Sequence, residues 1–124
     1  MDIFTCSLSQ WRVANAHGIE VVNTTQKSGL PIFAPSKHIV WGHKYYGMSD
    51  SEYRSQYVQQ MNQSYFQNRQ AWEEFLMFHR DGRIALACYC NKDAEFCHRF
   101  LLAPMLMKLA QHHHIPVAYY GEIR

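Results

Sequence analysis

Short apolar runs rich in β-branched residues alternate with helical patterns along the chain, and this alternation is the feature that most restricts the fold. Four such runs predict strands, at residues 2–6, 19–22, 83–88 and 115–119. Strands that are separated by helical segments require right-handed crossovers, which produce a mainly parallel sheet covered on both faces. The sequence therefore predicts an α/β fold in which about four strands are flanked by helices.

A capping pattern marks the start of the longest helical segment. Ser49 precedes Glu52 by three residues, as in a capping box, and aromatic and apolar residues then recur at steps of three and four up to His79. This spacing predicts one long amphipathic helix, or two helices that join near Asn68. The preceding segment, residues 30–47, contains two prolines and two glycines and is expected to be a long loop.

The composition is that of a single domain that spans residues 1–124. Hydrophobic residues make up 48% of the 124 residues and charged residues 18%, which is ordinary for a chain with a substantial core. No apolar stretch approaches the length of a membrane span and no secretory leader is recognisable, so we expect a cytoplasmic protein with no membrane partner. The net charge of +2 permits a nucleic-acid partner without requiring one.

Three of the four cysteines lie within ten residues, at the end of the third predicted strand and just after it. Such crowding is typical of thiols or metal ligands rather than of a disulfide-stapled domain. If a helix begins near Cys97, these cysteines meet at one strand-to-helix turn, which is where α/β proteins bind ligands. The residues expected there are Cys88, Cys90, Cys97, His98 and Arg99, joined by Ser7, Thr24 and Thr25 from the ends of other strands.

Several stretches of the chain, IFTCSLSQW, IEVVN, LACYC, FCHRFLLA and YYGEI, resemble the domain-of-unknown-function 488 family, particularly its small members from tailed bacteriophages. The resemblance covers nearly the whole chain, and the triplet Cys97-His98-Arg99 is its most specific part. It implies a compact α/β fold with a polar site around this triplet. The sequence departs from the family where Asn23-Thr24-Thr25 replaces Asp-Val-Arg and where Cys90 replaces an acidic residue. A more distant similarity is to rhodanese-like domains, whose compact cysteine loop this chain lacks.

Three chemistries fit the cysteine turn, and the first is metal binding. Cys88, Cys90, Cys97 and His98 offer the sulfur and imidazole ligands of a tetrahedral zinc site. Against this, Cys88 and Cys90 would point to opposite faces of an extended strand, and adjacent residues of a helix do not readily bind one ion. We therefore expect no cofactor, with zinc at these four residues as the alternative.

The second chemistry is that of a reactive thiol. At a helix N-terminus beside His98 and Arg99, Cys97 is expected to have a lowered pKa and to act as a nucleophile, with His98 carrying the proton. A second cysteine of the turn could resolve it as a disulfide. Glu122, placed directly after the last predicted strand, is a candidate base at the same edge of the sheet.

The third chemistry is anion recognition. Arg99 and the free amides at the helix start could bind a phosphate, because a guanidinium donates two parallel hydrogen bonds to it. The alternative is a solvated Arg99 that pairs locally with Asp93 or Glu95. Aromatic residues such as Trp41 and Tyr46 could stack on a base, and residues 41–46 are expected to cover it. The further residues expected to contact the ligand are Ser7, Trp11, Thr24, Thr25, Lys27, Tyr45, Cys88 and Cys90.

A phosphate-bearing ligand is the leading hypothesis from these patterns. We expect a small cytoplasmic protein with a Rossmann-like fold that binds a nucleotide or a nucleic-acid end at its strand tips, with or without catalysis. If it is phage-encoded, it would act in the host cytoplasm, in host takeover or counter-defence. The alternatives are a non-catalytic interaction protein with a structural cysteine or zinc knot, and a thiol-dependent sulfurtransferase or redox enzyme.

Overall fold

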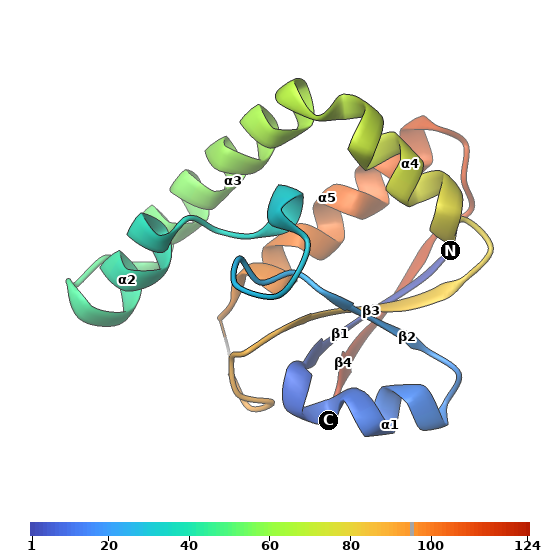
Figure 1. Cartoon of the computed structure of the whole chain (residues 1–124), viewed down its shortest axis with the longest axis horizontal. Helices are drawn as coiled ribbons and strands as arrows, with labels where there is room; N and C mark the ends of the chain where they lie inside the picture. Colours follow the sequence, from blue (N-terminus) through green and yellow to red (C-terminus); the bar gives the residue numbers. More distant parts are fainter. Residues whose placement is uncertain (95) are drawn as a thin grey trace.

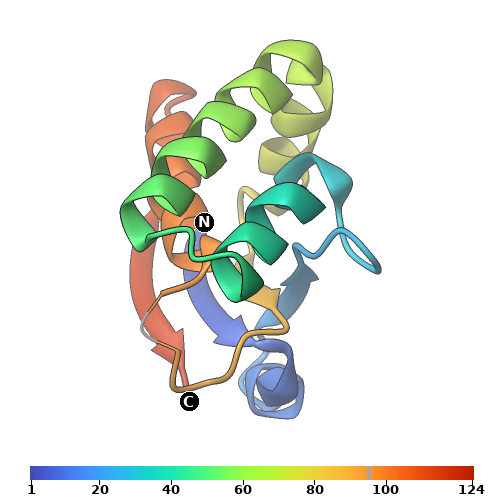
Figure 2. The same ribbon diagram turned by 90° about the vertical axis from the view of Figure 1, so that its left-hand side faces the viewer.

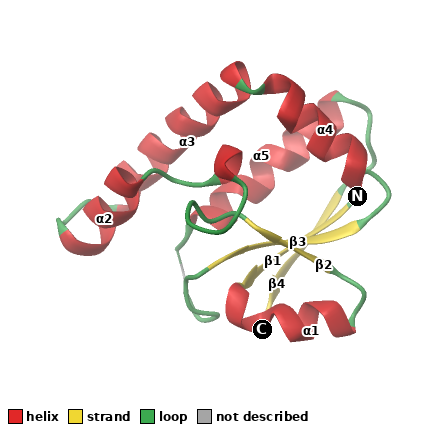
Figure 3. Ribbon diagram, viewed as in Figure 1, coloured by secondary structure: helices red, strands yellow, loops and turns green. Residues whose placement is uncertain are grey.

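Four parallel strands form the centre of the protein (Figure 3). This structure is a computed structural model that describes residues 1–94 and 96–124. The strands lie in the order β2-β3-β1-β4. The predicted α/β class with a parallel sheet is confirmed. The strand bounds are β1 (Asp2–Ser7), β2 (Glu20–Asn23), β3 (Arg83–Cys88) and β4 (Ala118–Ile123).

Helices cover both faces of this sheet (Figure 1). One face carries α1 (Trp11–Ala16), and the other carries α4 (Arg69–His79) and α5 (His98–His112). The remaining two helices, α2 (Lys37–Tyr45) and α3 (Asp50–Gln67), lie side by side, and α3 also packs against α5 (Figure 2). Short 3-10 turns occur at Leu8–Gln10 and Pro31–Phe33.

The side chains of β3 point alternately into two hydrophobic cores, one on each face of the sheet. Ile84 and Leu86 point into the large core beneath α3, α4 and α5, whereas Ala85 and Ala87 point into the small core beneath α1. Because side chains alternate with a period of two, Cys88 falls on the same face as Ile84 and Leu86. The strand therefore delivers the first cysteine of the turn to the α5 side of the sheet.

The capping prediction for the long helical segment is confirmed. The Ser49 hydroxyl accepts a hydrogen bond from the Glu52 amide at 3.1 Å, and the segment divides into α3 and α4 at Asn68. Within the described residues, none of the helices combines the length and the apolar character that crossing a membrane would require.

The prediction of a long loop at residues 30–47 is wrong, because this segment contains α2. Ser36 caps the helix by accepting a hydrogen bond from the Ile39 amide at 3.3 Å. Ile39 is the one fully buried residue of α2, so the segment lacks the apolar stripe that would reveal a helix. Its prolines precede the helix instead of interrupting it.

The last strand begins three residues later than predicted and continues to Ile123. Asp2 pairs with Ala118 and Ile3 with Tyr119, but Thr5 pairs with Glu122, so the register shifts between Ile3 and Thr5. Gly121 lies at this shift with a φ of 94°, a conformation that favours glycine. Glu122 is thus inside β4 and not beyond it, which corrects its predicted position.

The carboxyl ends of the strands align along one edge of the sheet, as predicted. Ser7 of β1 pairs with Cys88 of β3, and Asn23 of β2 pairs with Ala87. The chain leaves β1 toward α1 on one face and leaves β3 toward α5 on the other. Two neighbouring strands whose connections diverge in this way leave a crevice at their carboxyl ends, where open α/β sheets bind ligands.

Candidate functional site

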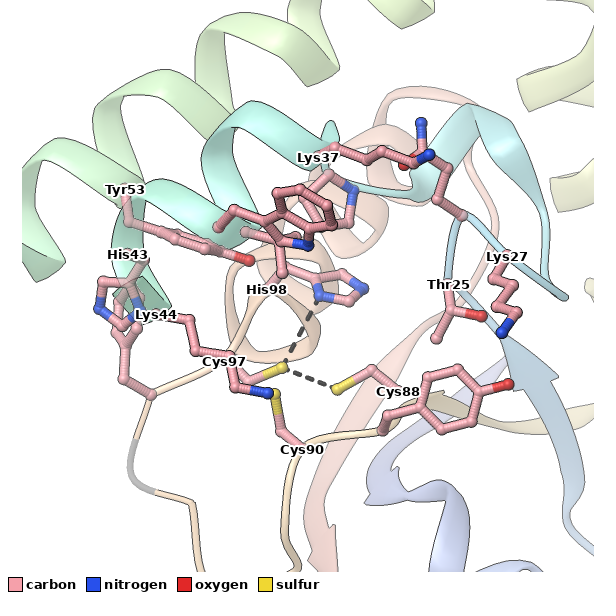
Figure 4. Close-up of a pocket in the computed structure, with 16 residues that line it drawn as sticks. Thr25, Lys27, Lys37, His43, Lys44, Tyr53, Cys88, Cys90, Cys97 and His98 are labelled. Carbon is pink, nitrogen blue, oxygen red and sulfur yellow. Dashed lines mark hydrogen bonds between the residues drawn. The ribbon is translucent and has the colours of Figure 1, made fainter. Parts of the chain in front are cut away.

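Two cysteines and a histidine meet where β3 ends and α5 begins. The Cys88 and Cys97 sulfurs are 2.7 Å apart, and the Cys97 sulfur lies 3.7 Å from Nδ1 of His98. Cys97 is the N-cap of α5, with an extended backbone at φ −164° and ψ 158°. Because it is not helical, its side chain and that of His98 can face the same centre (Figure 4). The two neighbours can therefore share a centre, although adjacent residues of a helix were not expected to bind one ion readily.

Thr24 holds the imidazole of His98 from the end of β2. Its hydroxyl donates to the carbonyl oxygen of Ala87 at 2.8 Å and lies 2.8 Å from Nε2 of His98. Both Thr24 and His98 are buried. Burial lowers the pKa of His98, so the ring is held in its neutral form.

Arg99 and Glu122 form a buried ion pair beneath the cluster. The Arg99 Nη2 lies 2.5 Å from Oε2 of Glu122 and its Nε lies 3.2 Å from Oε1. Arg99 also donates to the Cys88 sulfur at 3.1 Å and to the Asn91 carbonyl at 3.1 Å. Burial acts to lower the pKa of Arg99, but the hydrogen bonds to Glu122 and the nearby Cys88 outweigh it and raise that pKa.

This pairing bears on the predicted roles of Arg99. Its side chain is fully buried, so it is not the solvated residue of the alternative hypothesis, and its partner is Glu122. A pairing with Glu95 falls outside the described residues. Because Arg99 contacts residues on both sides of the turn after β3, it fixes that turn from below and does not line the cavity.

The pKa values of Cys90 and Cys97 are shifted in opposite directions. Hydrogen bonds from Cys88 and Cys97 lower the pKa of Cys90 to about 3, against the effect of burial and with help from the charges of Arg99 and Lys44. The same hydrogen bonds to Cys88 and Cys90, together with burial, raise the pKa of Cys97. The pKa of Cys97 is therefore shifted in the direction opposite to the prediction, because its sulfur is buried.

A cavity of about 1110 Å³ opens above the cluster, between the strand ends and α2. Its floor is formed by Cys88, Cys90, Cys97 and His98 (Figure 4). Aromatic side chains line its walls, and they belong to Trp41, Tyr53, Tyr89 and Phe96. Pockets for small molecules occupy about 300–1,000 Å³, so the space is sufficient for a ligand of nucleotide size.

Lysines, with no aspartate or glutamate, occur among the described residues that line this cavity. Lys27, Lys37 and Lys44 line it together with His43, and none of the described lining residues is a carboxylate. In the described part of the chain, none of the three lysines forms an ion pair with an acidic side chain. The cavity is therefore electropositive and suited to an anion.

The structure divides the predicted site residues into three groups. Six of them line the cavity, and these are Thr25, Lys27, Cys88, Cys90, Cys97 and His98. Three support it from beneath, and these are Thr24, Arg99 and Glu122. The last three lie outside it, because the Ser7 hydroxyl turns toward Ser9, Trp11 is 44% exposed on α1, and Tyr45 is 65% exposed at the end of α2.

Residues 41–46 were expected to cover a base, but Lys37 and Lys44 were not among the predicted ligand contacts. Lys37, Trp41 and Lys44 are spaced by four and three residues, which places them on one face of a helix. That spacing was the available signal, but it has meaning only once residues 37–45 are known to be helical. Tyr89 and Phe96 carried no such signal, because they lie on the irregular turn between β3 and α5.

We expect Cys90 to be the fastest of the four cysteines to react with iodoacetamide at neutral pH. It is exposed and its pKa is lowered, whereas Cys6, Cys88 and Cys97 are buried. In reduced protein freed of metal by a chelator, its alkylation should be about ten times faster than that of the others. Peptide mass spectrometry measures the rates, and a Cys90→Ser variant should lose the fast phase. Faster labelling of Cys97 would contradict this assignment.

The fold and the cluster define a parallel α/β protein with a buried Cys-Cys-His group beneath an electropositive cavity. A comparison with protein families matches residues 10–110 to the family described as the Active DUF488-N3 subclade. The chain belongs to this family, DUF488-N3a, and the predicted relationship to the domain-of-unknown-function 488 family is thereby confirmed. Neither the comparison with curated proteins nor that with solved structures found a match.

Proposed function

We propose that the cavity binds a phosphate-bearing ligand, a nucleotide or a nucleic-acid end. The observation that carries this proposal is the set of three lysines around a cavity with no carboxylate among its described lining residues. Lys37 and Lys44 lie on one face of α2 and Lys27 lies across from them, so a phosphate between them would meet positive charge from two sides (Figure 4).

Aromatic side chains support the nucleotide part of the proposal. Trp41 and Tyr89 line the cavity and are both largely exposed, so each offers a ring face to a base. Stacking of a base on an aromatic ring contributes about 1–3 kcal/mol. Arg99 does not bind the phosphate in this proposal, because its charge is already paired with Glu122. It stabilises the cavity floor through its hydrogen bond to Cys88. The cytoplasmic location and the phage setting stay predictions from the sequence.

Calorimetric titration with a nucleoside monophosphate and its nucleoside tests this proposal. We expect the monophosphate to bind, and the nucleoside to bind at least about tenfold more weakly because it lacks the anion. A Lys37→Gln/Lys44→Gln variant should weaken monophosphate binding by about 10–100-fold, the value of a hydrogen bond to a charged group. Lys108→Gln, on an exposed part of α5, is the matched control. Equal binding of nucleotide and nucleoside would exclude a phosphate site.

A thiol-dependent reaction is the second candidate function. It is favoured by the position of Cys90, which is exposed at the cavity and has a lowered pKa. A thiolate at that position could attack a bound ligand, as in a sulfurtransferase or a redox enzyme. Trapping of a covalent adduct on Cys90 by mass spectrometry, after incubation with a persulfide or a disulfide, would distinguish this function from simple binding.

A further inference from the structure

The hydrogen bonds of Thr24 determine which nitrogen of His98 carries the proton. The Thr24 hydroxyl gives its hydrogen to the carbonyl of Ala87, so its oxygen can only accept from His98. The backbone oxygen of Thr24, 3.2 Å from the same Nε2, is also an acceptor only. Nε2 is therefore the protonated nitrogen, and Nδ1 of the neutral ring presents a lone pair.

That lone pair is directed at the two buried sulfurs. Nδ1 of His98 and the sulfurs of Cys88 and Cys97 all lie within 4.8 Å of one another, and all three residues are buried. Two thiol sulfurs and a bare imidazole nitrogen are the ligand types that zinc prefers. An imidazole whose other nitrogen is fixed by a hydrogen bond is the usual arrangement of a metal-binding histidine.

Arg99 supports the cluster from below. It donates a hydrogen bond to the Cys88 sulfur at 3.1 Å, which fixes the position of that sulfur. Glu122 neutralises Arg99 on its far side. The Cys90 side chain points toward the other three residues of the cluster from the exposed side of the turn (Figure 4), so its sulfur is placed to complete a tetrahedral set.

We propose that Cys88, Cys97 and Nδ1 of His98 bind a zinc ion, with Cys90 as the fourth ligand and Thr24 as the residue that orients the imidazole. This inference does not depend on the proposed ligand of the cavity. Binding releases the thiol protons and separates the Cys88 and Cys97 sulfurs to about 3.8 Å, the spacing set by zinc–sulfur bonds of about 2.3 Å in a tetrahedron. A disulfide would instead bring them to about 2.0 Å.

Cobalt substitution tests the site in the whole, untagged and reduced chain. We expect one Co²⁺ per chain, with the intense visible absorption of a tetrahedral site and a thiolate-to-cobalt charge-transfer band, and displacement of the cobalt by zinc. Cys97→Ser and His98→Gln should weaken binding more than about 100-fold, and Cys90→Ser about tenfold. Thr24→Val should weaken it about tenfold, whereas Thr24→Ser, which keeps the hydroxyl, should restore it.

Cys6→Ser is the control, because it removes a buried cysteine outside the cluster. The histidine run at residues 112–114 is present in every variant and cannot explain a difference between them. X-ray absorption at the zinc edge of the wild-type chain provides a measurement that needs no variant to fold, and sulfur neighbours with an imidazole are expected. A reduced chain that takes up no cobalt or zinc, a shell of oxygen and nitrogen only, or equal binding by Cys97→Ser would overturn the proposal.

Discussion

Arg99→Ala is expected to lower the free energy of unfolding by about 3–5 kcal/mol, the cost of breaking a buried ion pair by removing one partner. The Glu122 side chain, which is only 8% exposed, would be left charged with no cation beside it. The Cys88 sulfur and the Asn91 carbonyl would each lose a donor as well. Urea unfolding at neutral pH, followed by circular dichroism under reducing conditions, measures the difference.

Two comparisons separate loss of the ion pair from loss of any arginine. Arg80→Ala removes an exposed arginine that lies 3.9 Å from Asp81, and it should change the stability by less than about 0.5 kcal/mol. Arg99→Met combined with Glu122→Gln removes both charges and should recover much of the loss. A single Arg99→Ala variant within about 1 kcal/mol of the wild type would show that the pair contributes little.

Gly29→Ala is expected to disrupt the segment that carries Thr25 and Lys27 into the cavity. A methyl group at Gly29 would overlap the carbonyl oxygen of Asn23 and would lie 2.6 Å from the amide nitrogen of Thr25. These are backbone atoms of a tight turn in which Gly29 donates to Thr25 and Leu30 donates to Asn23, each at 2.9 Å. The turn must therefore open. We expect a loss of stability of about 2–3 kcal/mol, as for overpacking in a core, together with weaker ligand binding.

Gly82→Ala is the matched control for this substitution. A methyl group at Gly82 would meet its nearest neighbour, the carbonyl oxygen of His79, at an ordinary 3.5 Å. The stability should stay within about 0.5 kcal/mol of the wild type, or rise, because alanine restricts the unfolded chain. Similar losses for the two variants in urea unfolding would mean that the close approach at Gly29 is not the cause.

Local patterns in the sequence were sufficient to predict the sheet and the location of the cysteine cluster. The period of β3 places Cys88 on the α5 face, and the capping box at Ser49 locates the start of α3. Contacts between distant segments could not be predicted in this way. Thr24 and His98 are 74 residues apart, and the pairing of Arg99 with Glu122 depends on the register shift in β4. The same holds for the acidity of Cys90, which arises from two thiols that only the folded turn brings together.

The wall and the floor of the cavity come from separate parts of the chain, and this has a consequence for how such a protein can evolve. The floor consists of strand ends and the start of α5, where Cys88 and His98 also form buried hydrogen bonds that hold the fold. The wall is one face of α2, a helix with a single fully buried residue, Ile39. Substitutions on that face can accumulate at low cost in stability. Descendants of this protein can thus acquire new ligand preferences through a few exposed positions of one short helix while the chemistry of the floor is inherited unchanged.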